Sequence, residues 1–155
     1  MFDDSKVMKW GLIIAAVIIV MRIIMEQVGV GESVNNIFGV AWLYFIIPVL
    51  FAFGIRSRNS ATPYKNLFKD IVLFVLYTRI MVMITYMLAY VFRWPARRFA
   101  YPGGSVGDNV DVWNGMLLIP LRNVAIWVVI ATIIGMIIGS ITLLIKRRAS
   151  APSPA

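Results

Sequence analysis

The sequence predicts an all-α integral membrane protein, a polytopic four-helix bundle with four transmembrane helices and both termini in the cytoplasm. Of its 155 residues, 61% are hydrophobic and only 14% are charged, which leaves too little polar surface to cover a soluble core. A transmembrane helix needs roughly 20 apolar residues, and four stretches come close to this length: residues 7–28, 37–55, 71–92 and 124–145. Residues 1–148 are therefore expected to form one transmembrane domain.

The first stretch, residues 7–28, combines small residues with two charged ones. Asp3 and Asp4 spoil the basic start that a cleaved signal peptide would need, so we expect the stretch to stay as a membrane span. At 100° per residue, five of its residues share one helix face, within about 60°. We interpret this as a packing face, because small residues let a second helix approach closely. Its members are Gly11, Ala15, Arg22, Glu26 and Gly29.

Arg22 and Glu26 are spaced four residues apart and are predicted to pair with each other. A self-neutralising structural pair is one interpretation of this spacing. The other is that Glu26 serves as the carboxylate of an ion or coupling site, because charged groups inside membranes often mark function.

The third stretch, residues 71–92, carries Arg79 near its middle. Arg79, Tyr86, Tyr90 and Arg93 lie within about 60° of one another on a helix and form a polar stripe. This stripe is predicted either to guide an anion, a lipid phosphate or protons, or simply to pack while Arg79 bonds to carbonyls, a tyrosine, water or another subunit. Arg79 and Glu26 should differ in depth by about 16 Å at 1.5 Å per residue, so we do not expect them to pair.

The second and fourth stretches contain no charged residue. The fourth carries Gly135 and Gly139 in a GxxxG spacing, which permits close helix contact either within the bundle or with another subunit.

Basic residues predict the orientation, since they are enriched in cytoplasmic segments. With four spans, the side that holds both termini has nine basic residues: Lys6, Lys9, Arg56, Arg58, Lys65, Lys69, Lys146, Arg147 and Arg148. The other side has four, Arg93, Arg97, Arg98 and Arg122. Three basic residues do not fit this orientation well, because they lie close to a span on the outer side: Arg93, Arg97 and Arg98. We interpret them as a contact with lipid headgroups or a partner.

Residues 93–123 are expected to form an extracytoplasmic loop, in which residues 111–121 make an interfacial helix or the tilted start of the fourth span. Residues 149–155 are expected to be a disordered tail. Trp42, Trp94, Trp113 and Trp127 are expected near the outer membrane surface, because tryptophan favours that boundary.

The residue types restrict the possible functions. The chain has no cysteine and no histidine, so the usual zinc, iron and thiolate sites are not expected, and neither a metal nor a cofactor is predicted. No basic, aromatic-interleaved segment predicts nucleic-acid binding. We expect a small non-enzymatic accessory or scaffold subunit that contacts membrane lipids and other membrane subunits or itself, in a bacterial inner membrane or an equivalent plasma membrane. The alternative is a small oligomeric transporter or channel that uses Arg22, Glu26 and Arg79.

Overall fold

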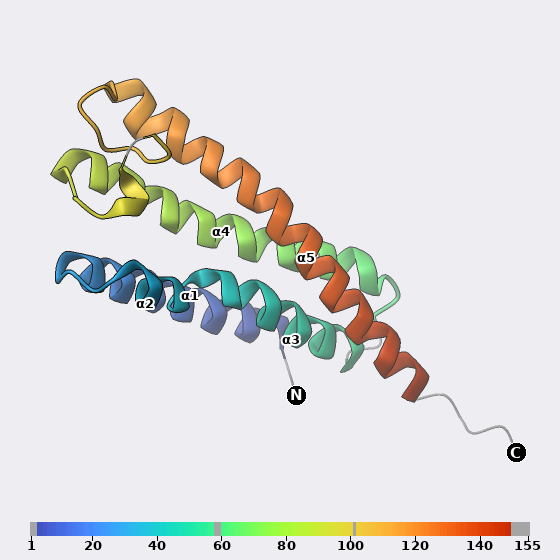
Figure 1. The fold of residues 1–155 in the computed structure, drawn as a ribbon. Coiled ribbons are helices and arrows are strands. Elements are labelled where there is room, and N and C mark those ends of the chain that lie inside the picture. Colours follow the sequence, from blue (N-terminus) through green and yellow to red (C-terminus); the bar gives the residue numbers. More distant parts are fainter. Residues whose placement is uncertain (1–2, 58–59, 101, 150–155) are drawn as a thin grey trace, which may run out of the picture.

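The computed structural model describes residues 3–57, 60–100 and 102–149 and contains helices but no strand in these ranges (Figure 1). Two 3₁₀ turns, Val40–Trp42 and Arg97–Phe99, and one π-helical turn, Asn114–Leu118, connect or extend the α-helices. The α-helices are α1 (Asp4–Gln27), α2 (Glu32–Ile37), α3 (Leu43–Ser57), α4 (Pro63–Phe92) and α5 (Ile119–Ala149). The expected disordered tail falls almost wholly outside the described residues.

Four helical segments of the described chain are long and apolar enough to cross a membrane: Asp4–Gln27, Glu32–Ser57, Pro63–Phe92 and Asn114–Ile145. The predicted all-α class and the four helices of membrane-spanning length are therefore confirmed.

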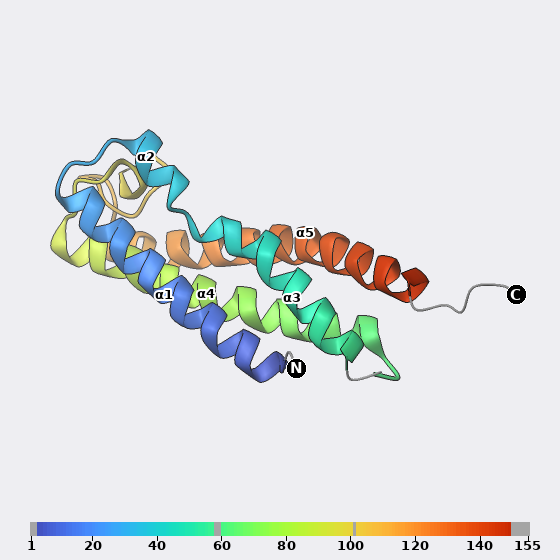
Figure 2. The ribbon, with the colours of Figure 1, turned by 90° about the horizontal axis from the view of Figure 1, so that it is seen from below.

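The four long segments lie side by side along one axis (Figure 1 and Figure 2). The α4 helix lies at the centre of the packing and contacts α1, α3 and α5. The start of α1, the α3–α4 connection and the end of α5 lie toward one end, which we call the terminal end. The α1–α2 connection and residues 93–100 and 102–113 lie at the opposite end, which we call the loop end.

The second span is interrupted, whereas the sequence suggested one continuous helix over residues 37–55. Gly39 has φ −93° and ψ 143°, an extended conformation that separates α2 from α3. The α3 helix alone has 15 residues, or about 22 Å of length, which is less than the hydrocarbon thickness of a bilayer. The preceding 3₁₀ turn and α2 complete this segment.

The fourth helical segment begins well before residue 124, so the connecting loop is shorter than residues 93–123. Asp111 caps the segment: its Oδ1 accepts a hydrogen bond from the Asn114 backbone N–H at 2.7 Å. Pro120 lies in the first turn of α5, where its ring would clash with the carbonyl four residues earlier in an ordinary α-helix. The wider π-helical turn Asn114–Leu118 directly before it provides the space.

The core is built from apolar side chains of all four long helices, with Phe51 and Phe74 at its centre. Glycines allow the close approaches. A Cβ on Gly11 would lie 3.0 Å from Ile47 and Phe74, and one on Gly139 would lie 2.8 Å from Leu67.

Gly135 likewise faces Ile71 and Pro48, so α5 turns both glycines of the GxxxG spacing toward its own bundle. Ala15, on α1, is fully buried in the core. Gly29 differs from this group: it has no neighbouring atom within 4 Å of a Cβ position and has φ +79°. It lies in the turn after α1, where a left-handed conformation favours glycine, so the structure gives it a turn role rather than a packing role.

Candidate functional site

Three charged residues meet at the loop end, and we call them the loop-end cluster: Arg22, Glu26 and Arg98. Arg22 Nε donates a hydrogen bond to Glu26 Oε1 at 3.1 Å. Arg98 Nε forms an ion pair with the same oxygen at 3.0 Å. The cluster therefore connects α1 to the segment after α4, and one carboxylate serves two guanidinium groups.

The cluster is tied to α2 as well, because Arg22 Nη2 donates to Asn36 Oδ1 at 3.0 Å. A second ion pair, which we call the rim pair, joins Arg97 Nη1 and Glu32 Oε2 at 3.0 Å. It also links α2 to the segment after α4. The rim pair is open to solvent, with 86% of the Arg97 side chain and 51% of the Glu32 side chain exposed. The loop-end cluster is much drier, since the Glu26 side chain is only 7% exposed.

A cavity of about 120 Å³ lies beside the cluster. Among the described residues that line it, three buried polar atoms have neither a hydrogen-bond partner nor an ion-pair partner: Glu26 Oε2, Asn35 Oδ1 and Arg98 Nη2. Burial lowers the pKa of the Arg98 guanidinium from its ordinary value, and the Glu26 carboxylate acts in the opposite direction. The cavity thus holds unused donors and acceptors side by side.

Arg79 forms a separate site in the middle of the bundle. It projects from α4 and is only 5% exposed. Its guanidinium carbon lies 4.3 Å from the ring centroid of Trp127 on α5 and 5.0 Å from that of Tyr44 on α3. We call these three residues the Arg79 site. Aromatic faces attract a cation electrostatically, and this attraction is stronger where water is excluded, so the rings stabilise the buried charge.

The other members of the predicted polar stripe hold the segment that follows α4. Tyr90 Oη donates to the Val110 carbonyl at 3.4 Å, and Arg93 Nη1 donates to the Gly107 carbonyl at 3.3 Å. The Tyr86 ring packs edge-on against Phe99 with 5.0 Å between centroids. Tyr86, Tyr90 and Arg93, the part of the stripe nearest the loop end, therefore contact residues of the same chain.

The structure brings Arg22, Glu26 and Arg98 together and leaves Arg79 apart from them. Glu26 is shared by the two arginines of the loop-end cluster, while Arg79 lies between two rings. Arg79 and Glu26 thus occupy different sites, as their difference in depth predicts.

The sequence reasoning missed three residues of these sites. Trp127 was expected at the membrane boundary, but its helical segment begins by Asn114, so Trp127 lies about 20 Å along the segment. Tyr44 follows a break in the second span that apolar composition did not reveal. Asn35 lies in a short polar helix. It is only 3% exposed, and nothing in the neighbouring sequence predicts that burial.

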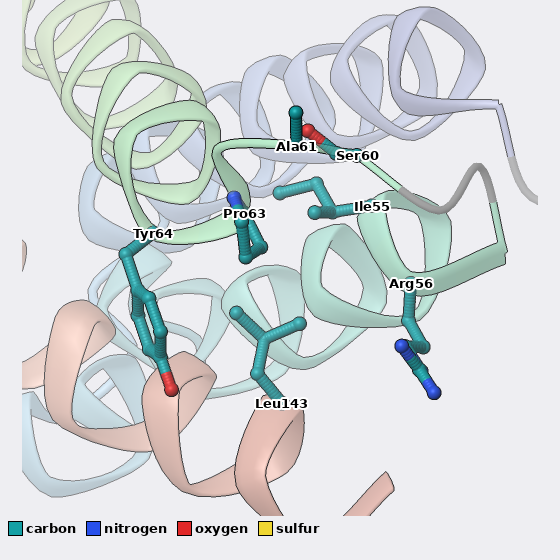
Figure 3. A pocket seen from close by; sticks show the side chains of 7 residues that line it. All are labelled: Ile55, Arg56, Ser60, Ala61, Pro63, Tyr64 and Leu143. Atoms are coloured by element: carbon teal, nitrogen blue, oxygen red, sulfur yellow. The ribbon is translucent and has the colours of Figure 1, made fainter. Parts of the chain in front are cut away.

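A larger cavity, of about 290 Å³, lies at the terminal end between α3, α4 and α5. Figure 3 shows Ile55 and Leu143 facing each other across it, with Pro63 and Tyr64 at the start of α4. The Arg56 side chain extends away from Pro63 and Tyr64 (Figure 3). Among the described residues that line this cavity, Arg56 is the one charged residue and it is only partly buried, so the loop-end cluster and the Arg79 site are the stronger candidates.

Chemically, the two sites differ in what they offer. The loop-end cavity can exchange hydrogen bonds with a polar group, whereas the Arg79 site is closed by aromatic rings. Comparison with protein-family models, with curated proteins and with solved structures finds no match to this chain.

Proposed function

We propose that this chain is a non-enzymatic integral membrane protein that acts as an accessory or scaffold subunit of a larger membrane complex. In the proposed orientation both termini lie in the cytoplasm, in the bacterial inner membrane or an equivalent plasma membrane. The excess of basic residues on the terminal side supports this orientation. It puts the loop end on the outer surface.

The observation that carries the proposal is the enclosure of Arg79. A charged residue that moves an ion or a substrate through the membrane faces a wet cavity or a substrate path. Arg79 instead is 5% exposed and lies between the rings of Tyr44 and Trp127, each on a different helix. This arrangement supports a role in holding α3, α4 and α5 together.

The outer face of α1 supports the second part of the proposal, contact with a partner helix. In the most apolar part of α1 only 22% of the residues are buried, compared with 44% in the second span. Val17, Val20 and Ile24 are each more than half exposed and line a shallow apolar groove together with Ala16. Membrane helices associate through close packing on such surfaces, so we place the partner contact there.

The test is purification of the full chain from its native membrane in mild detergent. The proposal predicts a foreign membrane subunit in fixed stoichiometry. Val20→Trp should lower its recovery about tenfold, because overpacking an interface costs on the order of 1–3 kcal/mol. Ile141→Trp is the matched control, since Ile141 is similarly exposed, at 51%, but lies on α5; it should leave recovery unchanged.

A different result would favour the transporter or channel. A stable homo-oligomer that moves a solute into liposomes, and loses this activity with Glu26→Gln or Arg79→Gln, would contradict the scaffold proposal. Equal recovery of the foreign subunit with Val20→Trp and Ile141→Trp would contradict the placement of the contact on α1.

A further inference from the structure

We propose that the loop-end cavity binds the headgroup of a zwitterionic aminophospholipid, with its phosphate on Arg98 and its primary ammonium on Glu26 and Asn35. This inference goes beyond the proposed scaffold function. It rests on one part of that proposal, the orientation of the chain in the membrane. In the proposed orientation, the cavity lies at the end of α1 where the helix reaches the outer headgroup layer.

Two buried acceptors point to the ammonium group. Asn35 uses its Nδ2 to donate to the Val30 carbonyl at 2.8 Å, which leaves Oδ1 without a partner among the described residues. Glu26 uses Oε1 for both arginines and leaves Oε2 unpaired. Both residues are more than nine-tenths buried and line the same cavity. Leaving a buried acceptor unpaired is costly because its hydration is lost without replacement, so a donor that enters this cavity is stabilised.

An unused donor beside these acceptors points to the phosphate group. Arg98 Nη2 is buried and has no hydrogen-bond partner within the described chain. Arg98 Nε lies 3.0 Å from Glu26 Oε1, so the free donor and the free acceptor belong to neighbouring groups. Guanidinium groups recognise phosphate through charge-assisted hydrogen bonds.

The mixture of charges selects a zwitterion over an ion of one sign. A simple anion would meet the three arginines that line the cavity, Arg22, Arg97 and Arg98, but would leave Glu26 Oε2 and Asn35 Oδ1 without a donor. A simple cation would meet these two acceptors but would leave Arg98 Nη2 unused and would be repelled by the three arginines. A primary ammonium linked to a phosphodiester satisfies both sides and brings N–H donors for Glu26 Oε2 and Asn35 Oδ1. A choline headgroup has no N–H donor, and a glycerol headgroup has no cation. The cavity of about 120 Å³ has room for one small polar group or several waters.

The experiment measures binding of dioleoyl phosphatidylethanolamine, phosphatidylcholine and phosphatidylglycerol to the full chain in detergent, by native mass spectrometry. We expect phosphatidylethanolamine to bind about tenfold more tightly than the other two, because buried charge-assisted hydrogen bonds are worth more than 1 kcal/mol. Binding of all three lipids within about twofold would show a cavity filled by water and would overturn the proposal. If soluble glycerophosphoethanolamine bound as tightly as the lipid, the lipid would be excluded as the source of the headgroup.

Two variants of Asn35 keep the test independent of folding. Asn35→Leu and Asn35→Asp both lose the donor to the Val30 carbonyl, but only the aspartate keeps an acceptor for an ammonium. Asn35→Leu should abolish the preference for phosphatidylethanolamine, and Asn35→Asp should retain it. Arg56→Gln, at the terminal end, is the control and should also retain it. Loss of the preference in Asn35→Asp, or its persistence in Asn35→Leu, would overturn the assignment.

Discussion

The loop-end cluster holds two partly buried arginines, Arg22 and Arg98, and the Arg79 site holds one buried arginine, and the two sites do so in different ways. At the loop end, Arg22 and Arg98 share the Glu26 carboxylate. In the middle of the bundle, Arg79 contacts the rings of two aromatic residues, and no ion pair is found for it among the described residues.

The two regions therefore depend on different chemical groups for their stability. Removing one member of a buried ion pair leaves the others uncompensated, which is strongly destabilising. A cation held by ring faces can be replaced by an apolar side chain of similar size without leaving any charge behind, whereas losing a ring exposes the cation to an apolar environment. The carboxylate is therefore the critical group at the loop end, and the ring is the critical group at the Arg79 site.

The largest effect is expected for Glu26→Gln. It leaves two partly buried guanidinium groups near each other without a counter-charge, so it should lower the free energy of unfolding by about 3 kcal/mol, the lower end of the range for buried pairs. The measurement is reversible unfolding of the full chain in mixed micelles with increasing denaturing detergent. A loss smaller than about 1 kcal/mol, the range of exposed pairs, would show that the loop-end cluster does not depend on its carboxylate.

The second effect concerns the ring at the Arg79 site. Trp127→Leu should cost about 2 kcal/mol or more, because a desolvated cation–π contact is lost together with aromatic packing. Arg79→Met should stay within about 1.5 kcal/mol of the native protein, since it removes the charge and nearly keeps the volume. The same unfolding assay measures both variants, with Trp10→Leu, at a residue that is 60% exposed, as the control. The reverse order of the two costs would contradict the comparison.

A smaller effect is expected at the rim pair of the loop end. Arg97→Gln removes an ion pair whose side chains are 86% and 51% exposed, and exposed pairs contribute about 0–1 kcal/mol. The change in unfolding free energy should therefore be several times smaller than that of Glu26→Gln. Similar costs for the two variants would mean that burial is not what separates the rim from the loop-end cluster.

The smallest effect is expected from Asp111, which is exposed and caps the fourth helical segment. Hydrogen bonds from the Asn114 backbone and side chain hold the pKa of the Asp111 carboxyl below its ordinary value of 3.8. Because the pKa is lower in the folded chain, this stabilisation is present above the ordinary value and is lost as the pH falls through the folded value.

Asp111→Ala should therefore lower the thermal unfolding midpoint at neutral pH and lower it less in acid. The check is to measure the thermal unfolding midpoints of the native chain and of Asp111→Ala from neutral pH down to below the ordinary carboxyl pKa of 3.8. A difference between the two proteins that does not change with pH would contradict the capping role of the carboxylate.

The long spans were predictable because apolar length is a local property of the sequence. The interruption at Gly39 was not, because the apolar stretch of residues 37–55 continues through it, and only the backbone conformation separates α2 from α3. For residues 111–121 the sequence left two alternatives, an interfacial helix or the start of the fourth span, because Gly115 and Pro120 weaken a helical pattern. The structure has the second, and a π-helical turn accommodates the proline.

The candidate sites were predictable only where their members share one helix. Arg22 and Glu26 pair at the spacing of four residues that the sequence displays. Arg98 comes from a segment 72 positions further along the chain, and its contact with Glu26 depends on how the loop end folds. The Arg79 site takes one residue from each of three helices, and no periodicity in a single sequence predicts which rings meet across such a bundle.

Whether Arg79 is a structural cation held by aromatic rings can be decided by a double-mutant cycle between Arg79 and Trp127. Unfolding free energies of the native chain, Arg79→Met, Trp127→Leu and the double variant yield the coupling between the two side chains. We expect a coupling of about 1–2 kcal/mol, because Trp127→Leu should cost much less once the charge is gone. Additive effects within about 0.5 kcal/mol would contradict it.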